Sequence, residues 1–140
     1  VPIPAQILRL LADLQAELGI AMVLITHDLG VVARIARQVA VMYAGQIVEE
    51  GPVESIFATP RHPYTQGLLG CIPVPGRTPP GESLGTIPGV VPSLVGDLRG
   101  CAFADRCRYA EPQCRDTIPV YGHPPEQQWR CIRQEEGVPA

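Results

Sequence analysis

The sequence has no segment long enough to cross a membrane and no strong excess of either charge. Its 140 residues contain no apolar run near the ~20 residues that a transmembrane helix needs. The first residues, "VPIPAQILRLL", lack a basic region ahead of an apolar core, so we do not expect a secretory signal there. The formal charge is only −3, which gives no reason to expect nucleic acid as the main partner. The length suits one ordinary domain or two small ones.

The sequence also lacks an initiator methionine and an opening strand. Its first residues have the apolar spacing of a helix, and the next apolar run is typical of a strand. A helix followed by a parallel strand requires an earlier strand with which that strand can pair. We therefore expect that an N-terminal part of the protein precedes this sequence.

The composition changes near residue 70. Residues 1–70 are rich in Leu, Ile, Val and Ala, whereas most Pro and Gly residues come later in the chain. Four of the five cysteines lie between residues 101 and 131. The chain therefore joins two parts of different composition.

Hydrophobic spacing predicts a helix, a strand and a second helix in the first part. Apolar residues recur at helical spacing over 3–18, and Gly19 is a natural end for that helix. Residues 20–25, "IAMVLI", form a continuous apolar run, which is typical of a strand covered on both faces. His27 follows this run, where active-site groups gather in parallel sheets, and Asp28 can cap the next helix. This order indicates the end of an α/β domain.

A β-hairpin and two short helices are predicted next. Residues 39–43 and 46–50 read as two strands joined by a tight turn at residues 44–45. Residues 52–57 suit a short helix with proline at an early position, and residues 64–69 suit another.

A Pro/Gly-rich connector follows over residues 73–96. Few of its residues can join a strand ladder or a helix. Its apolar residues are numerous enough to lie along a surface: Ile87, Val90, Val91, Leu94 and Val95. We expect an ordered, extended wrap rather than a free linker.

Four cysteines in about 30 residues require an explanation. Cys101, Cys107, Cys114 and Cys131 have the spacing C-x5-C-x6-C-x16-C, while Cys71 stands apart and suits an ordinary buried position. Disulfides are one alternative, but nothing in the sequence points to an oxidising compartment. Zinc sites usually contain C-x2-4-C pairs, so this spacing disfavours zinc without excluding it. An iron–sulfur cluster is wider than one metal ion and accommodates looser spacing.

The residues around these cysteines are basic, which fits either metal centre. Four thiolates around zinc or a cluster leave a net charge of about −2, which arginine donors offset. The arginines are Arg99, Arg106, Arg108, Arg115, Arg130 and Arg133. The remaining alternative is four reduced thiols in a small core.

Four stretches together resemble the ATP-binding subunits of bacterial dipeptide and oligopeptide ABC importers. "MVLITHDLGVVARIA" is similar to the last core strand and switch-histidine loop of an ABC ATPase, and "VAVMYAGQIVEEG" to the hairpin that follows. "IFATPRHPYTQGLL" is similar to the His-Pro-Tyr-Thr element that opens this family's C-terminal extension. "IPGVVPSLVGDLRGCAFADRC" resembles the stretch leading to its cysteines. The last two stretches narrow the resemblance to the peptide/nickel importer group.

The resemblance implies a fold class and a role for His27. The fold would be α/β, with the C-terminal fragment of a P-loop ABC ATPase sheet domain over residues 1–60. A small Pro/Gly-rich, four-cysteine extension would follow over residues 61–140. His27 would contact the γ-phosphate of ATP and help to position the attacking water, chemistry that suits an imidazole near neutral pH. Asp28 would cap the helix and orient the loop.

The resemblance also implies a cofactor in the extension. Four residues would bind a [4Fe-4S] cluster, with zinc as the alternative: Cys101, Cys107, Cys114 and Cys131. The role of this centre would be structural or regulatory. His62 and Tyr64 would position the extension rather than take part in chemistry, because Pro63 between them favours a fixed turn.

Three elements of an ABC ATPase are absent from the sequence. It has no G-x-x-x-x-G-K-[ST] phosphate loop, no LSGGQ-like signature and no apolar strand ending in Asp-Glu. Arg37 also stands where the family more often has Asp. We therefore expect that this chain alone neither binds ATP tightly nor hydrolyses it.

The resemblance implies partners and a location for the whole protein. It would bind ATP and Mg²⁺ on the cytoplasmic face of the cell membrane, and act with transmembrane permease subunits and a second ATP-binding subunit. A different class of function stays open, namely a stand-alone iron–sulfur or zinc module for interaction or regulation, without ATPase activity. An exposed edge of the strand over 20–25 would also favour self-association of the chain.

Overall fold

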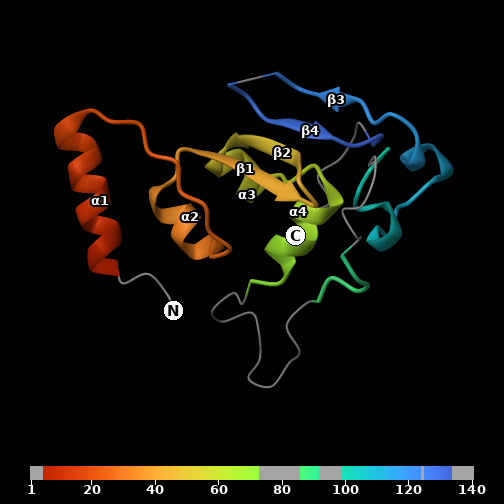
Figure 1. Cartoon of the computed structure of the whole chain (residues 1–140), viewed down its shortest axis with the longest axis horizontal. Helices are drawn as coiled ribbons and strands as arrows, with labels where there is room; N and C mark the ends of the chain where they lie inside the picture. Colours follow the sequence, from red (N-terminus) through yellow and green to blue (C-terminus); the bar gives the residue numbers. More distant parts are fainter. Residues whose placement is uncertain (1–4, 73–85, 92–98, 124, 134–140) are drawn as a thin grey trace. The chain divides into compact units, whose positions relative to one another are not determined.

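The computed structural model describes residues 5–72, 86–91, 99–123 and 125–133, which belong to two compact units. The first unit is Val1–Ala36 and the second is Arg37–Ala140. Figure 1 labels their helices and strands in chain order. In the part of the chain that is described, no helix is both long and apolar enough to span a bilayer.

The first unit begins with the predicted amphipathic helix. Helix α1 spans Ala5–Leu18. Gly19 ends it with a φ of +63°, and its N–H donates to the carbonyl of Gln15 at 3.0 Å. Glycine adopts this left-handed conformation without the steric cost of a side chain, so the prediction of a glycine cap is confirmed.

The strand predicted over residues 20–25 is wrong. These residues form no strand, and the side chains of Val23 and Ile25 are 89% and 94% exposed. A strand exists only when its N–H and C=O groups pair with a neighbouring strand. No strand among the described residues pairs with this run. An apolar sequence alone therefore does not produce the predicted parallel strand.

The second helix of this unit forms as predicted. Helix α2 spans Leu29–Ile35, and Asp28 is its N-cap. The carboxylate oxygen Oδ1 of Asp28 accepts the N–H groups of Gly30 at 2.9 Å and Val31 at 3.2 Å. These are two of the N–H groups at the helix start that have no partner within the helix.

The second unit is built on a four-stranded antiparallel sheet. Strands β1 (Gln38–Tyr43) and β2 (Gln46–Pro52) form the predicted hairpin. Its turn residues, Ala44 and Gly45, have φ values of +48° and +76°, as a tight two-residue hairpin turn requires. The α/β fold class is confirmed at this level, as a small α/β structure, but its sheet is antiparallel.

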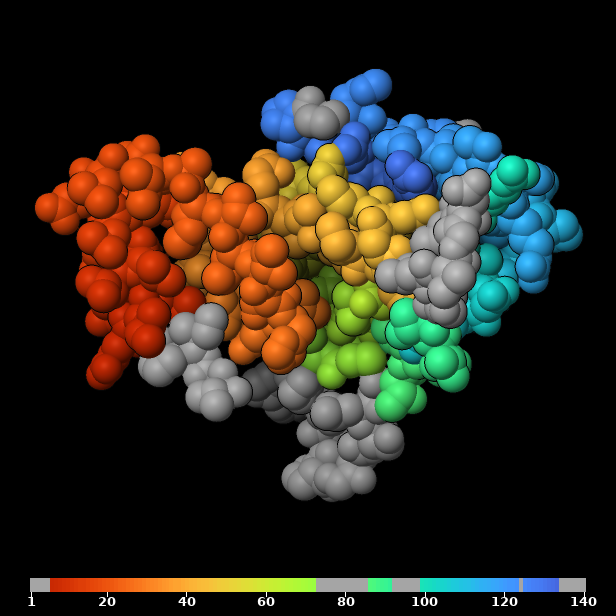
Figure 2. Space-filling model, viewed as in Figure 1, coloured from red at the N-terminus to blue at the C-terminus, as the bar shows by residue number. Residues whose placement is uncertain are grey.

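Two short strands from the C-terminal part complete this sheet. Strand β4 (Gln128–Arg130) pairs with β2, and β3 (Val120–Tyr121) pairs with β4, so the order is β1-β2-β4-β3. In the space-filling view the C-terminal residues, in blue, lie directly against the hairpin, in yellow (Figure 2). These strands are only two and three residues long, and the sequence pattern does not predict them.

Short helices surround the hairpin. Helices α3 (Val53–Ala58) and α4 (Pro63–Gly70) agree with the predicted helices. The 3₁₀ turns η1 (Ala104–Arg106) and η2 (Pro112–Arg115) lie among the cysteines. The buried apolar core contains Val41, Tyr43, Val48, Ile56 and Phe103. The Tyr43 and Phe103 rings meet edge to face with centroids 5.3 Å apart, which ties the cysteine-rich segment to the hairpin.

Most of the predicted connector lies outside the described residues. Within its described part, Ile87 packs against the core. The Arg106 guanidinium donates to the backbone carbonyls of Ile87 at 2.6 Å and Pro88 at 2.8 Å. This short portion of the connector is therefore held at the surface of the second unit by Ile87 and Arg106, while the predicted extended wrap stays a prediction.

Candidate cysteine–histidine site

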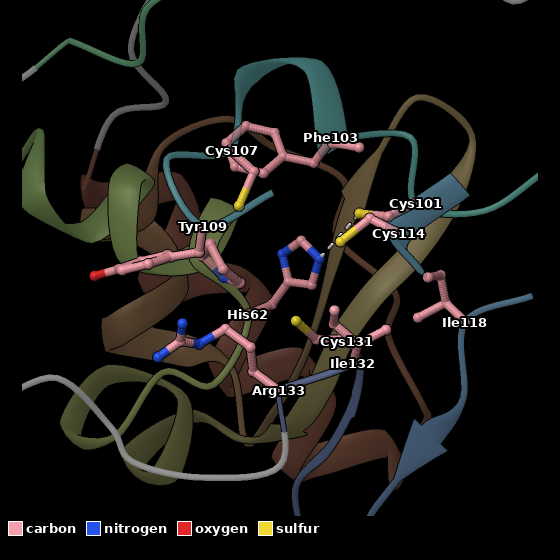
Figure 3. A pocket seen from close by; sticks show the side chains of 12 residues that line it. His62, Cys101, Phe103, Cys107, Tyr109, Cys114, Ile118, Cys131, Ile132 and Arg133 are labelled. Carbon is pink, nitrogen blue, oxygen red and sulfur yellow. Dashed lines mark hydrogen bonds between the residues drawn. The ribbon is translucent and has the colours of Figure 1, made fainter. Parts of the chain in front are cut away.

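The four cysteines singled out by their spacing border one pocket of the second unit. Cys101 precedes η1, Cys107 follows it, Cys114 lies in η2, and Cys131 directly follows β4. Figure 3 shows their sulfur atoms and the ring of His62 facing the same space. Only about 10 Å³ of the pocket admits a water-sized sphere, and the 330 Å³ of empty space around it includes open solvent. The fold thus gathers cysteines that are up to 30 positions apart in sequence, together with His62, which lies 39 positions before Cys101.

The thiols are free and are not arranged around a single point. All five cysteines are unpaired, and the fifth, Cys71, does not line the pocket. Among the described residues, no group of three or more His, Cys, Asp and Glu side chains is arranged to hold a metal ion. The disulfide alternative therefore does not describe this structure.

A glycine brings two of the cysteine segments together. The N–H of Cys101 donates to the carbonyl of Cys114 at 2.8 Å. Gly100 has a φ of +77°, and a Cβ added to it would lie 2.4 Å from that carbonyl oxygen. Only glycine therefore permits both the backbone conformation and the close approach.

Backbone N–H groups and burial set the electrostatics of the thiols. The N–H of Glu111 points at the sulfur of Cys114 at 3.5 Å. Burial, with a smaller contribution from the three neighbouring cysteines, raises the pKa of the Cys101 thiol to about 11, although a backbone hydrogen bond at Phe103 acts to lower it. Burial also raises the pKa of Cys107 and of Cys131, while Arg133 acts to lower both. Without a metal, these three thiols are therefore protonated and neutral at pH 7.

His62 is the one histidine that lines this pocket. Its side chain is only 1% exposed, and burial lowers its pKa to about 4. It is the N-cap of α4, because its Nδ1 accepts the N–H of Tyr64 at 3.1 Å. Its Nε2 lies 3.9 Å from the sulfur of Cys101. His62 thus caps α4 and contacts Cys101, and its expected role in positioning the extension stays a prediction.

A buried carboxylate that the sequence analysis missed holds the His62 segment in place. Glu49 on β2 is 1% exposed. Its Oε1 accepts the Arg61 N–H and the Gln127 side-chain amide, both at 2.6 Å, and its Oε2 accepts the His62 N–H at 2.9 Å. The pair Glu49-Glu50 in the sequence gives no sign of which carboxylate points inward, so only the three-dimensional contacts identify it.

His27 lies in the other unit and is not part of this pocket. Its side chain is exposed on the loop that leads into α2. The neighbouring Asp28 is occupied by the helix cap, and its own N–H donates to the hydroxyl of Thr26 at 3.0 Å. The loop is therefore ordered by Thr26 and Asp28, which leaves the imidazole of His27 free of that task.

Comparisons with known proteins show which family this chain resembles. Residues 48–114 match the family described as "Oligopeptide/dipeptide transporter, C-terminal region". This match begins within strand β2, at Val48, and includes the His-Pro-Tyr turn and three of the four pocket cysteines. The predicted resemblance to the C-terminal part of the ATP-binding subunits of bacterial peptide ABC importers is therefore confirmed.

Individual relatives are similar over nearly the whole chain. A peptide import ATP-binding protein of Brucella ovis is 50% identical over 141 residues, which is 97% of this chain and 42% of that protein. A peptide ABC transporter ATP-binding protein of Sinorhizobium fredii is 48% identical over 99% of this chain and 41% of its own. The dipeptide transport ATP-binding protein of Escherichia coli is 48% identical over 86% of this chain and 36% of its own. The chain thus spans well under half the length of these relatives.

Proposed function

We propose that this chain works as the C-terminal part of an ATP-hydrolysing subunit that energises peptide import. The observation that carries the proposal is the 50% identity to a peptide import ATP-binding protein over 97% of the chain. In the whole protein, ATP and Mg²⁺ would bind to elements that this sequence lacks. The subunit would act on the cytoplasmic face of the membrane, with transmembrane permease subunits and a second ATP-binding subunit.

Within that assembly, His27 is proposed as the contact to the γ-phosphate. An imidazole can donate a hydrogen bond to a phosphate oxygen and polarise a nearby water near neutral pH. The structure supports this role through the immediate surroundings of His27. The side chain is exposed at the entry to α2, and the loop is held by Asp28 and Thr26 rather than by His27.

A hybrid protein tests this role. The present chain would replace the matching C-terminal part of the Escherichia coli dipeptide transport ATP-binding protein. We expect the hybrid to hydrolyse ATP, and His27→Ala to lower kcat by about 100-fold or more. The matched control is His123→Ala, since His123 is exposed and outside the pocket. Equal ATP hydrolysis with and without the His27 imidazole contradicts the proposal.

The four pocket cysteines are proposed as the ligands of a [4Fe-4S] cluster, with zinc as the alternative. The donor set fits a cluster better than a single ion, because four free thiols border one pocket while no group converges on one point. Cluster ligands surround an object wider than one ion. When bound, the cluster would cross-link the segments of Cys101, Cys107, Cys114 and Cys131. Arg133 beside the thiols would offset the negative charge.

Metal analysis of anaerobically purified protein tests this site. We expect iron and acid-labile sulfide in nearly equal amounts, with an absorption band near ~400 nm that Cys114→Ser removes. Cys71→Ser is the matched control, because Cys71 does not line the pocket. A content of one zinc ion per chain without sulfide would contradict the cluster and support the alternative, a zinc site.

The proposed division near residue 60 falls just before the His-Pro-Tyr turn. Residues 61–140 would form the extension of the importer family, which carries all four cysteines. The pairing of β2 with β4 links the two sides of this boundary. Limited proteolysis of the whole protein, with the cleavage sites identified by mass spectrometry, would locate the boundary.

A further inference from the structure

The imidazole of His62 faces a sulfur atom of the cysteine pocket. Its Nε2 lies 3.9 Å from the Sγ of Cys101, as the dashed line in Figure 3 marks. The two residues are 39 positions apart in sequence, and the histidine side chain is almost completely buried. A buried polar atom of this kind needs a partner, and the sulfur of Cys101 is the partner that the fold provides.

The hydrogen bond at the other ring nitrogen, Nδ1, determines which nitrogen of His62 carries the proton. The N–H of Tyr64 donates to Nδ1 at 3.1 Å, so Nδ1 is an acceptor and holds no proton. In a neutral imidazole one nitrogen carries the hydrogen and the other accepts. The hydrogen of His62 is therefore on Nε2, and it points toward the side of the ring where the sulfur of Cys101 lies.

The donor is held in place by the fold rather than by a metal. The His62 N–H donates to the buried carboxylate of Glu49 at 2.9 Å, and the ring packs against Phe103 with centroids 6.0 Å apart. Pro63 follows directly as the first residue of α4. These contacts hold the Nε2–H group beside the pocket.

We propose that His62 donates an Nε2–H···S hydrogen bond to the Cys101 thiolate when Cys101 binds the cluster. This inference rests on the cluster proposed above. His62 is then a positioning residue rather than a ligand. Ligation through Nε2 would require the proton to move to Nδ1, where it would face the N–H of Tyr64, and two donors would then oppose each other. The donated hydrogen bond stabilises negative charge on sulfur, which favours the reduced cluster and slows its loss.

Two substitutions separate the donor from the helix cap. His62→Asn keeps an acceptor oxygen near the position of Nδ1, so the cap of α4 is retained while the donor is lost. His62→Gln places an amide N–H₂ near the position of Nε2, and is the conservative variant expected to restore the donor. His123→Asn makes the same chemical change at an exposed histidine and is the control.

The experiment compares these proteins after anaerobic purification. We would measure three properties of each protein. They are the iron and sulfide content, the reduction potential followed by electron paramagnetic resonance, and the rate of cluster loss to an iron chelator. We expect His62→Asn to retain iron and sulfide, to shift to a lower potential, and to lose the cluster on the order of tenfold faster. His62→Gln should return both properties toward the starting protein, and His123→Asn should change neither.

The outcomes distinguish the two proposals. If the unsubstituted protein holds no iron and sulfide, the cluster proposal is overturned and the role of His62 falls with it. If the cluster is present and His62→Asn leaves its potential and stability unchanged, only the role of His62 is overturned. Loss of iron from both His62→Asn and His62→Gln also overturns it, because His62 would then be a ligand or a residue needed for folding.

Discussion

Single side chains in the second unit hold together segments that are far apart in sequence. Glu49 is the clearest case, because its two carboxylate oxygens accept three hydrogen bonds from two distant segments, those of Arg61-His62 and Gln127. His62 is the next link, since it caps α4 and faces Cys101. A change at either residue should therefore affect the whole pocket.

Replacement of Glu49 should destabilise the second unit. Glu49→Ala leaves the N–H groups of Arg61 and His62 buried without their acceptor, and hydrogen bonds to a charged group are worth more than neutral ones. We expect a loss of about 3 kcal/mol in the free energy of unfolding, measured by urea denaturation. Glu54→Ala, at an exposed position in α3, is the control and should cost well under half as much. Equal losses for the two variants would contradict the assigned role.

Burial of His62 should make the metal-free protein sensitive to acid. The pKa of His62 is about 4 in the folded state, against 6.5 for the unperturbed side chain. The unfolded chain therefore binds the proton more readily, so this contribution to stability is complete above pH 6.5 and is lost as the pH falls toward 4. We expect a loss of up to about 3 kcal/mol across this range, measured by denaturation at several pH values. In His62→Asn this part of the pH dependence should disappear, and its persistence would count against the argument.

At the scale of elements, the turns between the cysteines bring the pocket residues together. Cys101 and Cys114 come together through one backbone hydrogen bond, and Gly100 is the residue that allows it. In the first unit, α2 is only seven residues long and begins at the Asp28 cap. Both features depend on local backbone geometry rather than on buried area.

A side chain at Gly100 should disrupt the pocket. In Gly100→Ala the new Cβ would lie 2.4 Å from the Cys114 carbonyl, at a φ that alanine disfavours. We expect a destabilisation of about 2 kcal/mol or more. Gly70→Ala is the matched control, because its Cβ would meet nothing within 4 Å. A Gly100→Ala protein as stable as Gly70→Ala would show that the close approach is not required.

Loss of the Asp28 carboxylate should destabilise α2. Asp28→Ala removes the acceptor for the N–H groups of Gly30 and Val31 and should cost about 1 kcal/mol. Hydrogen exchange of the α2 amides would detect this as weaker protection. Asp28→Asn keeps an acceptor oxygen and should behave nearly as the original, so strong loss of protection in that variant would point to a role for charge instead.

At the scale of the molecule, the two units differ in how they bury apolar side chains. The second unit encloses its core between the hairpin, α3 and the cysteine-rich turns. The first unit leaves large apolar side chains exposed, and those of Val23 and Ile25 are almost completely so. Such a concentration of exposed apolar surface is typical of a region that another part of a protein covers.

Self-association of the chain alone stays a prediction, now with a different cause. It was expected from a strand edge, but the exposed apolar run over residues 20–25 supplies the reason instead. We expect sedimentation velocity to show species larger than the monomer at high concentration. Val23→Ser with Ile25→Ser should shift the chain toward the monomer. A clean monomer for the unsubstituted chain at high concentration would contradict this prediction.

The sequence by itself determined the local elements of this protein. It predicts the helical spacing, the Asp28 cap, the Gly19 end and the hairpin turn, because each of these depends on neighbouring residues. The cysteine spacing and the His-Pro-Tyr element were also sufficient to indicate the importer family. Tertiary structure decided the rest. It left residues 20–25 without a partner strand among the described residues, added β3 and β4 to the hairpin, and buried the Glu49 carboxylate against the His62 segment. These outcomes depend on contacts between residues far apart in the chain, and no local pattern contains that information.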